Sequence, residues 1–218
     1  MLINEPKRLG LSFISLTMIV TAVAITSVTA QTYPTEPLTW GVKAGINTSD
    51  FLGKDAANSE IQEDFSGGIL LNYRFNDYWA LQPEFIFNRK GADLDRGLTG
   101  ENGPARYEFG YINIPVLVKY YIPSGMRFSP NLYAGPEAGF KLYGESNGSD
   151  INRDLNNTEF GVAFGVELDF SLGSDPTNLI RTVGLDFRYS LGLTEIFDTP
   201  QKPEARNGVF FAALFIGF

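Results

Sequence analysis

Nine charged residues stand at alternating positions within otherwise apolar or glycine-containing stretches of the chain. They are Lys43, Arg74, Glu84, Lys119, Glu137, Glu167, Asp169, Asp186 and Arg188. Carboxylates interleaved with cations can form ion pairs, and a pair of carboxylates can also act as general acid and general base. Because the four cations and five anions nearly balance, the pattern favours a structural ion-pair network over catalysis, with an ion path as the alternative.

Other catalytic and metal-binding chemistries lack the residue types they need. The chain contains no histidine and no cysteine, so Ser-His-Asp triads, Cys-His pairs and His/Cys metal sites are all excluded. Asp150, Asn152, Asp154 and Asn156 have the two-residue spacing of a calcium loop. Leu155, however, stands where that loop needs glycine, and no glutamate closes the loop. We therefore predict a protein that is not an enzyme and has no cofactor and no metal.

The elements that must position these charges are β-strands, and the clearest of them runs from Gly110 to Ile122. Successive side chains of a strand point to opposite faces, so alternate residues share a face. One face is wholly apolar: Ile112, Ile114, Val116, Val118, Tyr120 and Ile122. The other face carries the amide of Asn113 and the ammonium of Lys119. This alternation lasts as long as a bilayer-spanning strand, which needs about 9–11 tilted residues.

The same alternation recurs along the chain and predicts eight strands. They are Trp40–Asn47, Gly67–Phe75, Tyr78–Asn88, Gly110–Ile122, Pro130–Lys141, Thr158–Phe170, Thr182–Leu191 and Val209–Phe218. Their connections alternate between long and short, as in outer-membrane barrels with short periplasmic turns and long external loops. We predict an all-β fold: an eight-stranded antiparallel up-and-down transmembrane β-barrel over residues 40–218. A soluble barrel, the alternative, would have an apolar interior, whereas here the polar registers contain glycine and single charges.

The size of such a barrel fixes what its interior can do. Eight strands leave just enough room for the side chains themselves, so the interior charges should pair with one another and no wide pore is expected. Lys119 and Glu137 lie on the inward registers of neighbouring strands, and we expect them to pair. Glu84 is the alternative partner of Lys119.

The N-terminal 30 residues have the pattern of a cleaved secretory signal peptide, with a membrane anchor helix as the alternative. Lys7 and Arg8 precede a mostly apolar run, and Val28-Thr29-Ala30 is a small-residue cleavage site before Gln31. Residues 31–39 would then form a short periplasmic lead-in. Cleavage removes two of the 17 basic and one of the 25 acidic residues and leaves a net charge of −9, which opposes nucleic-acid binding.

Three segments resemble the PorT-like family of bacterial outer-membrane β-barrel proteins. They are WGVKAGIN (Trp40–Asn47), YINIPVLVKYY (Tyr111–Tyr121) and NLYAGPEAGF (Asn131–Phe140), and the resemblance extends over the whole predicted barrel. It implies a location in the outer membrane of the Gram-negative cell envelope. The terminal Phe218 resembles the signal read by the outer-membrane barrel assembly machinery. Outer-membrane lipid and this machinery are therefore expected partners.

Three functions are left open by the sequence. The first is a structural or interaction protein whose four acidic loops face outward. The second, implied by the resemblance, is a component or accessory of protein secretion, with secretion or surface proteins as partners. The third is a small channel for ions or solutes.

Overall fold

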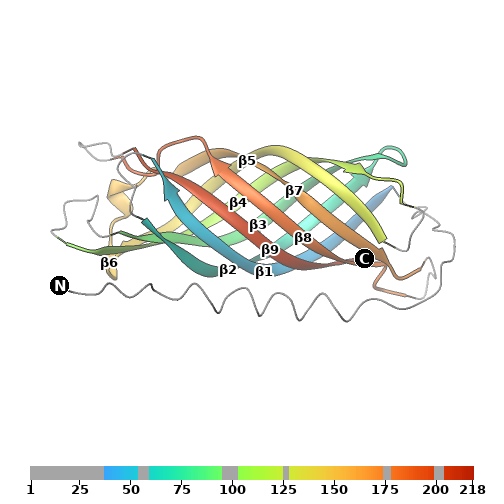
Figure 1. The fold of residues 1–218 in the computed structure, drawn as a ribbon, viewed down its shortest axis with the longest axis horizontal. Helices are drawn as coiled ribbons and strands as arrows, with labels where there is room; N and C mark the ends of the chain where they lie inside the picture. The colour runs from blue at the N-terminus through green and yellow to red at the C-terminus, as the bar shows by residue number, and fades with distance from the viewer. Residues whose placement is uncertain (1–36, 54–58, 95–102, 125–127, 174–177, 199–203) are drawn as a thin grey trace, which may run out of the picture.

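The computed structural model describes residues 37–53, 59–94, 103–124, 128–173, 178–198 and 204–218. The expected signal peptide, its cleavage site between Ala30 and Gln31, and most of the expected lead-in lie outside these residues. Within them, eight long strands form one barrel (Figure 1). They are β1 Leu38–Leu52, β2 Ser59–Arg74, β3 Trp79–Leu94, β4 Ala105–Tyr121, β5 Phe128–Ser146, β7 Thr158–Ser171, β8 Thr182–Gly192 and β9 Arg206–Gly217.

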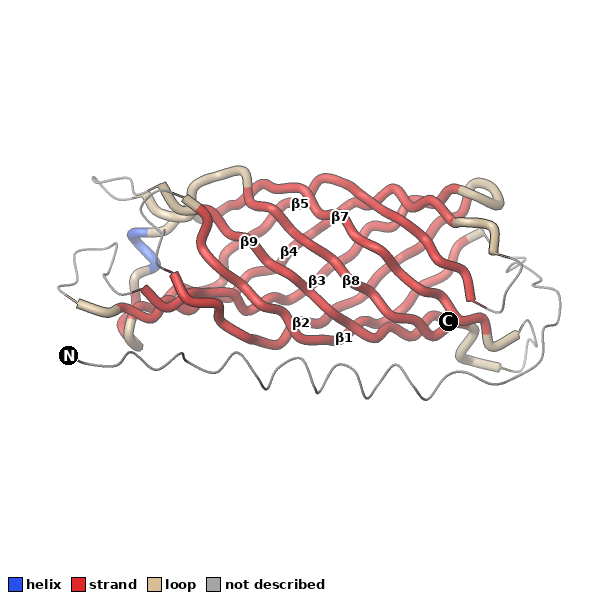
Figure 2. The backbone as a smooth tube through the Cα atoms, viewed as in Figure 1, coloured by secondary structure: helices blue, strands red, loops and turns tan. Residues whose placement is uncertain are grey.

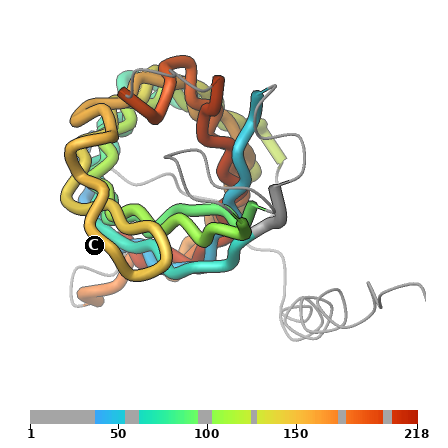
Figure 3. Tube along the Cα trace, turned by 90° about the vertical axis from the view of Figure 1, so that its left-hand side faces the viewer, coloured from blue at the N-terminus to red at the C-terminus, as the bar shows by residue number. Residues whose placement is uncertain are grey.

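The barrel is closed, and every pair of neighbouring strands is antiparallel. The order around it is β4-β3-β2-β1-β9-β8-β7-β5, and a β4–β5 ladder completes the ring that Figure 3 shows. The first strand also pairs with the last, with Gly41 opposite Gly217, so none of the eight long strands is an edge strand. The predicted eight-stranded antiparallel barrel is confirmed. No helix among the described residues is long and apolar enough to cross a membrane.

The two faces of the strands differ as the alternation predicts. On β4, Val116 and Val118 are 36% and 44% exposed on the outside, whereas Leu117 and Lys119 are 0% and 1% exposed inside. The large apolar side chains that are exposed on the barrel wall form a surface suited to hydrocarbon. The terminal Phe218 stacks on Trp40 with ring centroids 4.3 Å apart, at the end of the barrel where β1 begins and β9 ends.

Several strands continue beyond the ranges that the sequence predicts. The expected long loop from Arg89 to Arg106 is shorter, because β3 runs on to Leu94 and β4 begins at Ala105. In these extensions the hydrophobic face is reversed. Tyr107 and Phe109 are buried inside the barrel, while Arg89 and Glu108 form an ion pair of 3.1 Å on its outside. Such a reversal is expected where the outer wall leaves lipid and meets water.

The reversed face builds an apolar core inside one end of the barrel, which we call the outer core. Its residues are Phe51, Ala92, Leu94, Ala105, Tyr107, Phe109, Tyr111, Ile151, Leu155, Ile196, Phe197 and Ala205. Two connections fold over it. One contains the two-residue strand β6 (Ser149–Asp150) and the 3₁₀ helix η2 (Asn152–Asp154), which is the blue segment in Figure 2. The other follows β8.

Backbone contacts fasten these two connections to each other. Leu155 and Phe197 form an isolated antiparallel bridge, and the Asn156 amide donates to the Ile196 carbonyl at 2.9 Å. The Lys141 ammonium donates to the carbonyls of Asn152, at 2.7 Å, and of Leu155, at 3.0 Å. The outer core is therefore covered at the end that carries the longer connections, which is the external end of outer-membrane barrels.

Candidate functional site in the barrel lumen

The middle of the lumen contains a network of buried ion pairs centred on Lys43. Its ammonium lies 2.7 Å from Asp186 Oδ2, 3.0 Å from Glu84 Oε1 and 3.3 Å from Glu167 Oε2. These four residues come from β1, β3, β7 and β8, and each points inward because it belongs to the polar register of its strand. One cation thus joins carboxylates from three separate strands.

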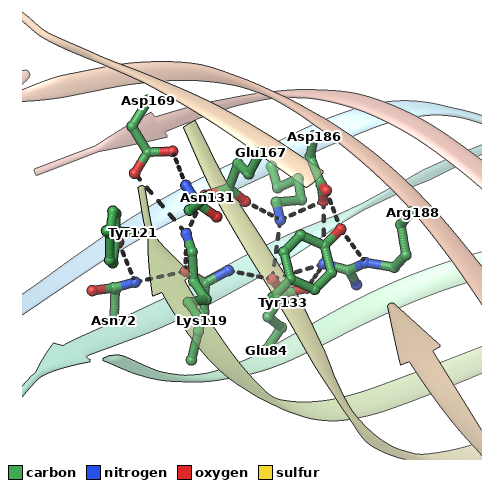
Figure 4. A network of polar contacts seen from close by, with 12 residues as sticks. Asn72, Glu84, Lys119, Tyr121, Asn131, Tyr133, Glu167, Asp169, Asp186 and Arg188 are labelled. Atoms are coloured by element: carbon green, nitrogen blue, oxygen red, sulfur yellow. Dashed lines mark hydrogen bonds and ion pairs between the residues drawn. The ribbon is translucent and has the colours of Figure 1, made fainter. Parts of the chain in front are cut away.

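Arg188 is the second cation of this network (Figure 4). Its guanidinium lies 2.8 Å from Glu84 Oε2 and 3.1 Å from Asp186 Oδ2, so both carboxylates are shared with Lys43. The Tyr133 hydroxyl donates to Asp186 and accepts a bond from Arg188 Nε at 3.3 Å. Charges removed from water need such multiple partners, because an unpaired buried charge costs several kcal/mol.

Lys119 binds partners other than those expected. Its ammonium donates to Glu167 and, at 3.1 Å, to Gln82, and it lies 4.0 Å from Asp169 Oδ2. The expected pair with Glu137 is therefore wrong, because the β4–β5 register places Tyr133 opposite Lys119. The alternative partner, Glu84, binds Lys43 and Arg188 instead.

Glu137 is a buried carboxylate that belongs to none of the ion pairs of the described residues. It accepts hydrogen bonds from Asn113 Nδ2 and, at 3.2 Å, from Ser190 Oγ. It borders a void of about 10 Å³ that Lys90 and Arg188 also line. A void of this size holds about one water molecule, which could link the carboxylate to either cation.

A second buried ion pair joins Lys90 to Glu159 and was not foreseen. The Lys90 ammonium lies 3.2 Å from Glu159 Oε1 and 4.6 Å from the centre of the Tyr111 ring, and Asn207 Nδ2 donates to Glu159 Oε2 at 2.6 Å. The sequence predicts a loop at Lys90, because the alternating pattern of the third strand ends at Asn88. Its position, six residues after Glu84 on the same register, is the signal that could have identified it.

Arg74 and Asp169 lie toward the end of the barrel where β1 begins and β9 ends. The Arg74 guanidinium stacks over the Tyr121 ring at 3.8 Å from the centroid and donates to the Asp77 carbonyl at 3.1 Å. Asp169 accepts a bond from Asn131 Nδ2 at 2.9 Å. Of the nine charged residues singled out in the sequence, the structure thus joins seven in the central network. Arg74 and Glu137 lie outside it.

The lumen is accordingly a filled, polar interior bounded by the outer core. A cavity of about 60 Å³ adjoins the central network on the side where β1 begins and β9 ends. Among the described residues, no group of three or more Asp or Glu side chains is arranged as a metal site. The side chains and their pairing suit a rigid barrel wall.

Comparison with known proteins identifies the family. The model of the outer membrane protein beta-barrel domain matches residues 29–198, which is most of the chain. The protein belongs to the outer membrane protein beta-barrel domain family. Members of this family are barrels of the outer membrane, and the outer membrane is the location of this chain too. No curated protein matches it.

Several solved outer-membrane proteins are similar to this chain. OprG of Pseudomonas aeruginosa is 15% identical with a TM-score of 0.53, and the match covers 83% of this chain and 95% of OprG. Neisserial surface protein A is 17% identical (TM-score 0.47; 84% and 100% covered). Ail, the attachment invasion locus protein of Yersinia pestis, was solved in complex with the heparin analogue sucrose octasulfate. It is 14% identical (TM-score 0.45; 84% and 100% covered).

Proposed function

We propose that this outer membrane protein beta-barrel domain protein is a non-enzymatic interaction protein that acts through its external end. The observation that supports this proposal is the outer core above the central ion-pair network. Both fill the lumen, which disfavours the passage of solutes. What then faces the exterior is a surface of connections held in place by a packed core. Binding groups act best when they are carried by rigid elements of this kind.

The external surface also has a charge that selects a class of partner. Five acidic side chains are exposed on the described part of it: Glu63, Glu145, Asp150, Asp198 and Glu204. The exposed cations there are Arg106, Arg153 and Arg206, and two of the three already pair with neighbouring carboxylates. A partner with a positively charged surface fits this distribution, since complementary potentials speed and orient association.

The test is cross-linking on intact cells, which samples only what the external end touches. A variant with Glu145→Gln, Asp150→Asn and Asp198→Asn should lose the cross-linked partner, whereas Asp77→Asn in the periplasmic β2–β3 turn should keep it. Both variants should be present at the wild-type level in the outer membrane. Cross-links that persist unchanged in the triple variant, or none to any protein in the wild type, would overturn the proposal.

Participation in protein secretion is the second candidate, and the support for it is the resemblance of Tyr111–Tyr121 and Asn131–Phe140 to PorT-like proteins. Deletion of the gene separates it from the first candidate. Loss of particular proteins from the secreted fraction would favour secretion, and an unchanged secreted fraction would remove it. A small channel is the third candidate, and steady conductance of the purified barrel in planar bilayers would favour it over both.

A further inference from the structure

The connection between β7 and β8 exposes aliphatic side chains at the periplasmic end of the barrel. Leu172, Leu179 and Ile180 are 52%, 75% and 38% exposed, and we call these three side chains the aliphatic turn. Leu179 is the most exposed large apolar side chain among the described residues. Together with Asn178 the aliphatic turn borders a concavity of about 390 Å³. Such a surface is unusual for a turn in water, where polar side chains predominate.

The aliphatic turn continues the lipid-facing wall of the barrel. Leu172 follows Phe170 by two residues and so belongs to the outward register of β7. The Leu172 amide donates to the Arg181 carbonyl at 2.9 Å, which extends the β7–β8 ladder one step past the pair of Ser171 and Thr182. The surface that begins at Leu172 is therefore continuous with the wall that meets hydrocarbon, and the same ladder holds it in place.

The turn on the opposite side of the barrel has a different composition. Around the ring, β2 is four positions from β7 and β3 is four positions from β8, so the β2–β3 turn lies across the barrel from the aliphatic turn. Its tip is Asn76-Asp77, and Asn76 Oδ1 accepts bonds of 2.9 Å from the amides of Tyr78 and Trp79. Exposed Tyr and Trp side chains are typical of the boundary between membrane and water. The described part of the β7–β8 connection contains neither Tyr nor Trp, which indicates that hydrocarbon contact extends farther on that side.

We propose that the aliphatic turn inserts into the periplasmic leaflet of the outer membrane and that the concavity beside it takes a phospholipid acyl chain. The acyl chains that cover the outward register of β7 reach this surface without a break, because Leu172 prolongs that register. Burial of the aliphatic turn among acyl chains removes its apolar surface from water. The turn thereby anchors the β7–β8 side of the barrel in the inner leaflet. This surface lies at the opposite end of the barrel from the proposed interaction surface and does not depend on it.

The first experiment measures which solvent surrounds the turn. The chain has no cysteine, so Leu179→Cys carries a single nitroxide label. The folded barrel is placed in nanodiscs of palmitoyl-oleoyl phosphatidylcholine, one barrel per disc. Collisions of the label with oxygen, which enriches in lipid, are compared with collisions with a water-soluble nickel complex. The oxygen-to-nickel ratio for Leu179→Cys should approach that of the lipid-facing Val118→Cys. It should exceed that of Asp77→Cys in the β2–β3 turn at least fivefold. A ratio equal to that of Asp77→Cys would overturn the proposal.

A second copy of the chain is the other occupant that this experiment detects. Proteoliposomes with a high protein content bring barrels together, whereas discs with one barrel do not. Dipolar broadening of the Leu179→Cys label in such proteoliposomes, together with a water-like ratio in the discs, would overturn the proposal in favour of an interface between copies. A lipid-like ratio in both preparations, without broadening, supports insertion into the leaflet.

The second experiment removes the aliphatic side chains and reads the label at a neighbouring position. With the label on Leu172→Cys, the added changes Leu179→Asn and Ile180→Asn should lower the oxygen-to-nickel ratio at least threefold. The matched changes Leu179→Met and Ile180→Val, which stay apolar, should leave the ratio unchanged. The heat-modifiable gel shift verifies folding of each variant. If the Asn variant does not fold, the single-cysteine variants of the first experiment decide alone. An unchanged ratio in a folded Asn variant would show that these side chains do not hold the turn in lipid.

Discussion

Lys119 on β4 donates a hydrogen bond to Glu167 on β7, although β5 lies between these strands in the sheet. The contact is possible because both side chains point into the lumen, where strands that are not neighbours face one another. Glu167 also reaches Lys43 on β1 at 3.3 Å. The bond between Lys119 and Glu167 therefore ties strands that are not neighbours in the barrel wall together through their side chains.

Loss of Lys119 should destabilise the folded barrel strongly. Lys119→Ala leaves Glu167 with Lys43 alone and removes the cation that lies 4.0 Å from Asp169, and breaking a buried pair in this way costs about 3–5 kcal/mol. The measurement is urea unfolding in lipid, followed by the gel shift of the heat-modifiable band. Val118→Ala is the control, because that side chain faces lipid and should change the unfolding free energy by about 0.5 kcal/mol or less.

Two buried glutamates should respond differently to the same isosteric change. Glu167→Gln removes a charge that two lysines compensate, and should lower the unfolding free energy by about 3–5 kcal/mol. Glu137→Gln removes a buried charge that forms no ion pair with a described residue, and it should change stability far less. Equal destabilisation by both variants, measured in the same urea titrations, would show that Glu137 is also held by a cation.

A cation on the lipid-facing register should impair insertion. Val118→Lys places an ammonium in hydrocarbon, which costs about 2–4 kcal/mol near the bilayer midplane. The folded fraction recovered from membranes should fall, whereas Val118→Leu should be recovered normally. Normal recovery of Val118→Lys would mean that the inward and outward registers of β4 are assigned the wrong way round.

The outer core should protect the external connections from protease. Phe197→Ala removes an aromatic ring that packs against Phe51, Tyr107 and Phe109, and such truncations cost about 3–5 kcal/mol in well-packed cores. Trypsin added to whole cells should then cleave after the exposed Arg153 faster than in the wild type. Leu193→Ala is the control, since Leu193 is exposed. Equal cleavage of both variants would show that packing against the outer core does not protect the external connections.

The last strand should govern assembly. Phe218 stacks on Trp40, and its amide donates to the Trp40 carbonyl at 2.8 Å, next to the β1–β9 ladder that closes the barrel. Phe218→Ala should therefore reduce the heat-modifiable fraction in cells, and deletion of Val209–Phe218 should abolish it. Refolding of purified Phe218→Ala from urea separates the two causes. Normal refolding with poor assembly in cells would place the defect in recognition by assembly factors.

The part of the fold that faces lipid could be predicted from the sequence, because apolar and polar residues alternate along each of its strands. From Trp79 to Phe87 every second residue except Pro83 is a large apolar side chain that must meet hydrocarbon, and single charges mark the inside. Beyond Arg89 the pattern continues with its faces exchanged, so the apolar outward positions that indicate a lipid-facing strand end there. The missed Lys90 lies just past this point.

The sequence predicts which charged residues face the lumen, but it does not predict which of them pair with one another. Strand registers place charges on the inward face, yet a pairing across the lumen depends on the shear of the whole barrel. Lys119 illustrates this, because Glu137, the partner expected on the adjacent strand β5, lies opposite Pro115. Its actual partner, Glu167, is two strands away.

The exchange of faces along β3 also fixes how deep the barrel sits in the bilayer. Phe85 and Phe87 are the last outward apolar side chains of this strand, and Arg89 follows them, paired with Asp64 at 3.4 Å. If the barrel moved toward the periplasm by two residues, about 6–7 Å along the strand, the Arg89 guanidinium would enter the hydrocarbon layer. A displacement outward would expose both rings to water. The change from Phe87 to Arg89 therefore fixes where the edge of the hydrocarbon layer meets the barrel wall. A bilayer of different thickness must adapt to the protein at this boundary.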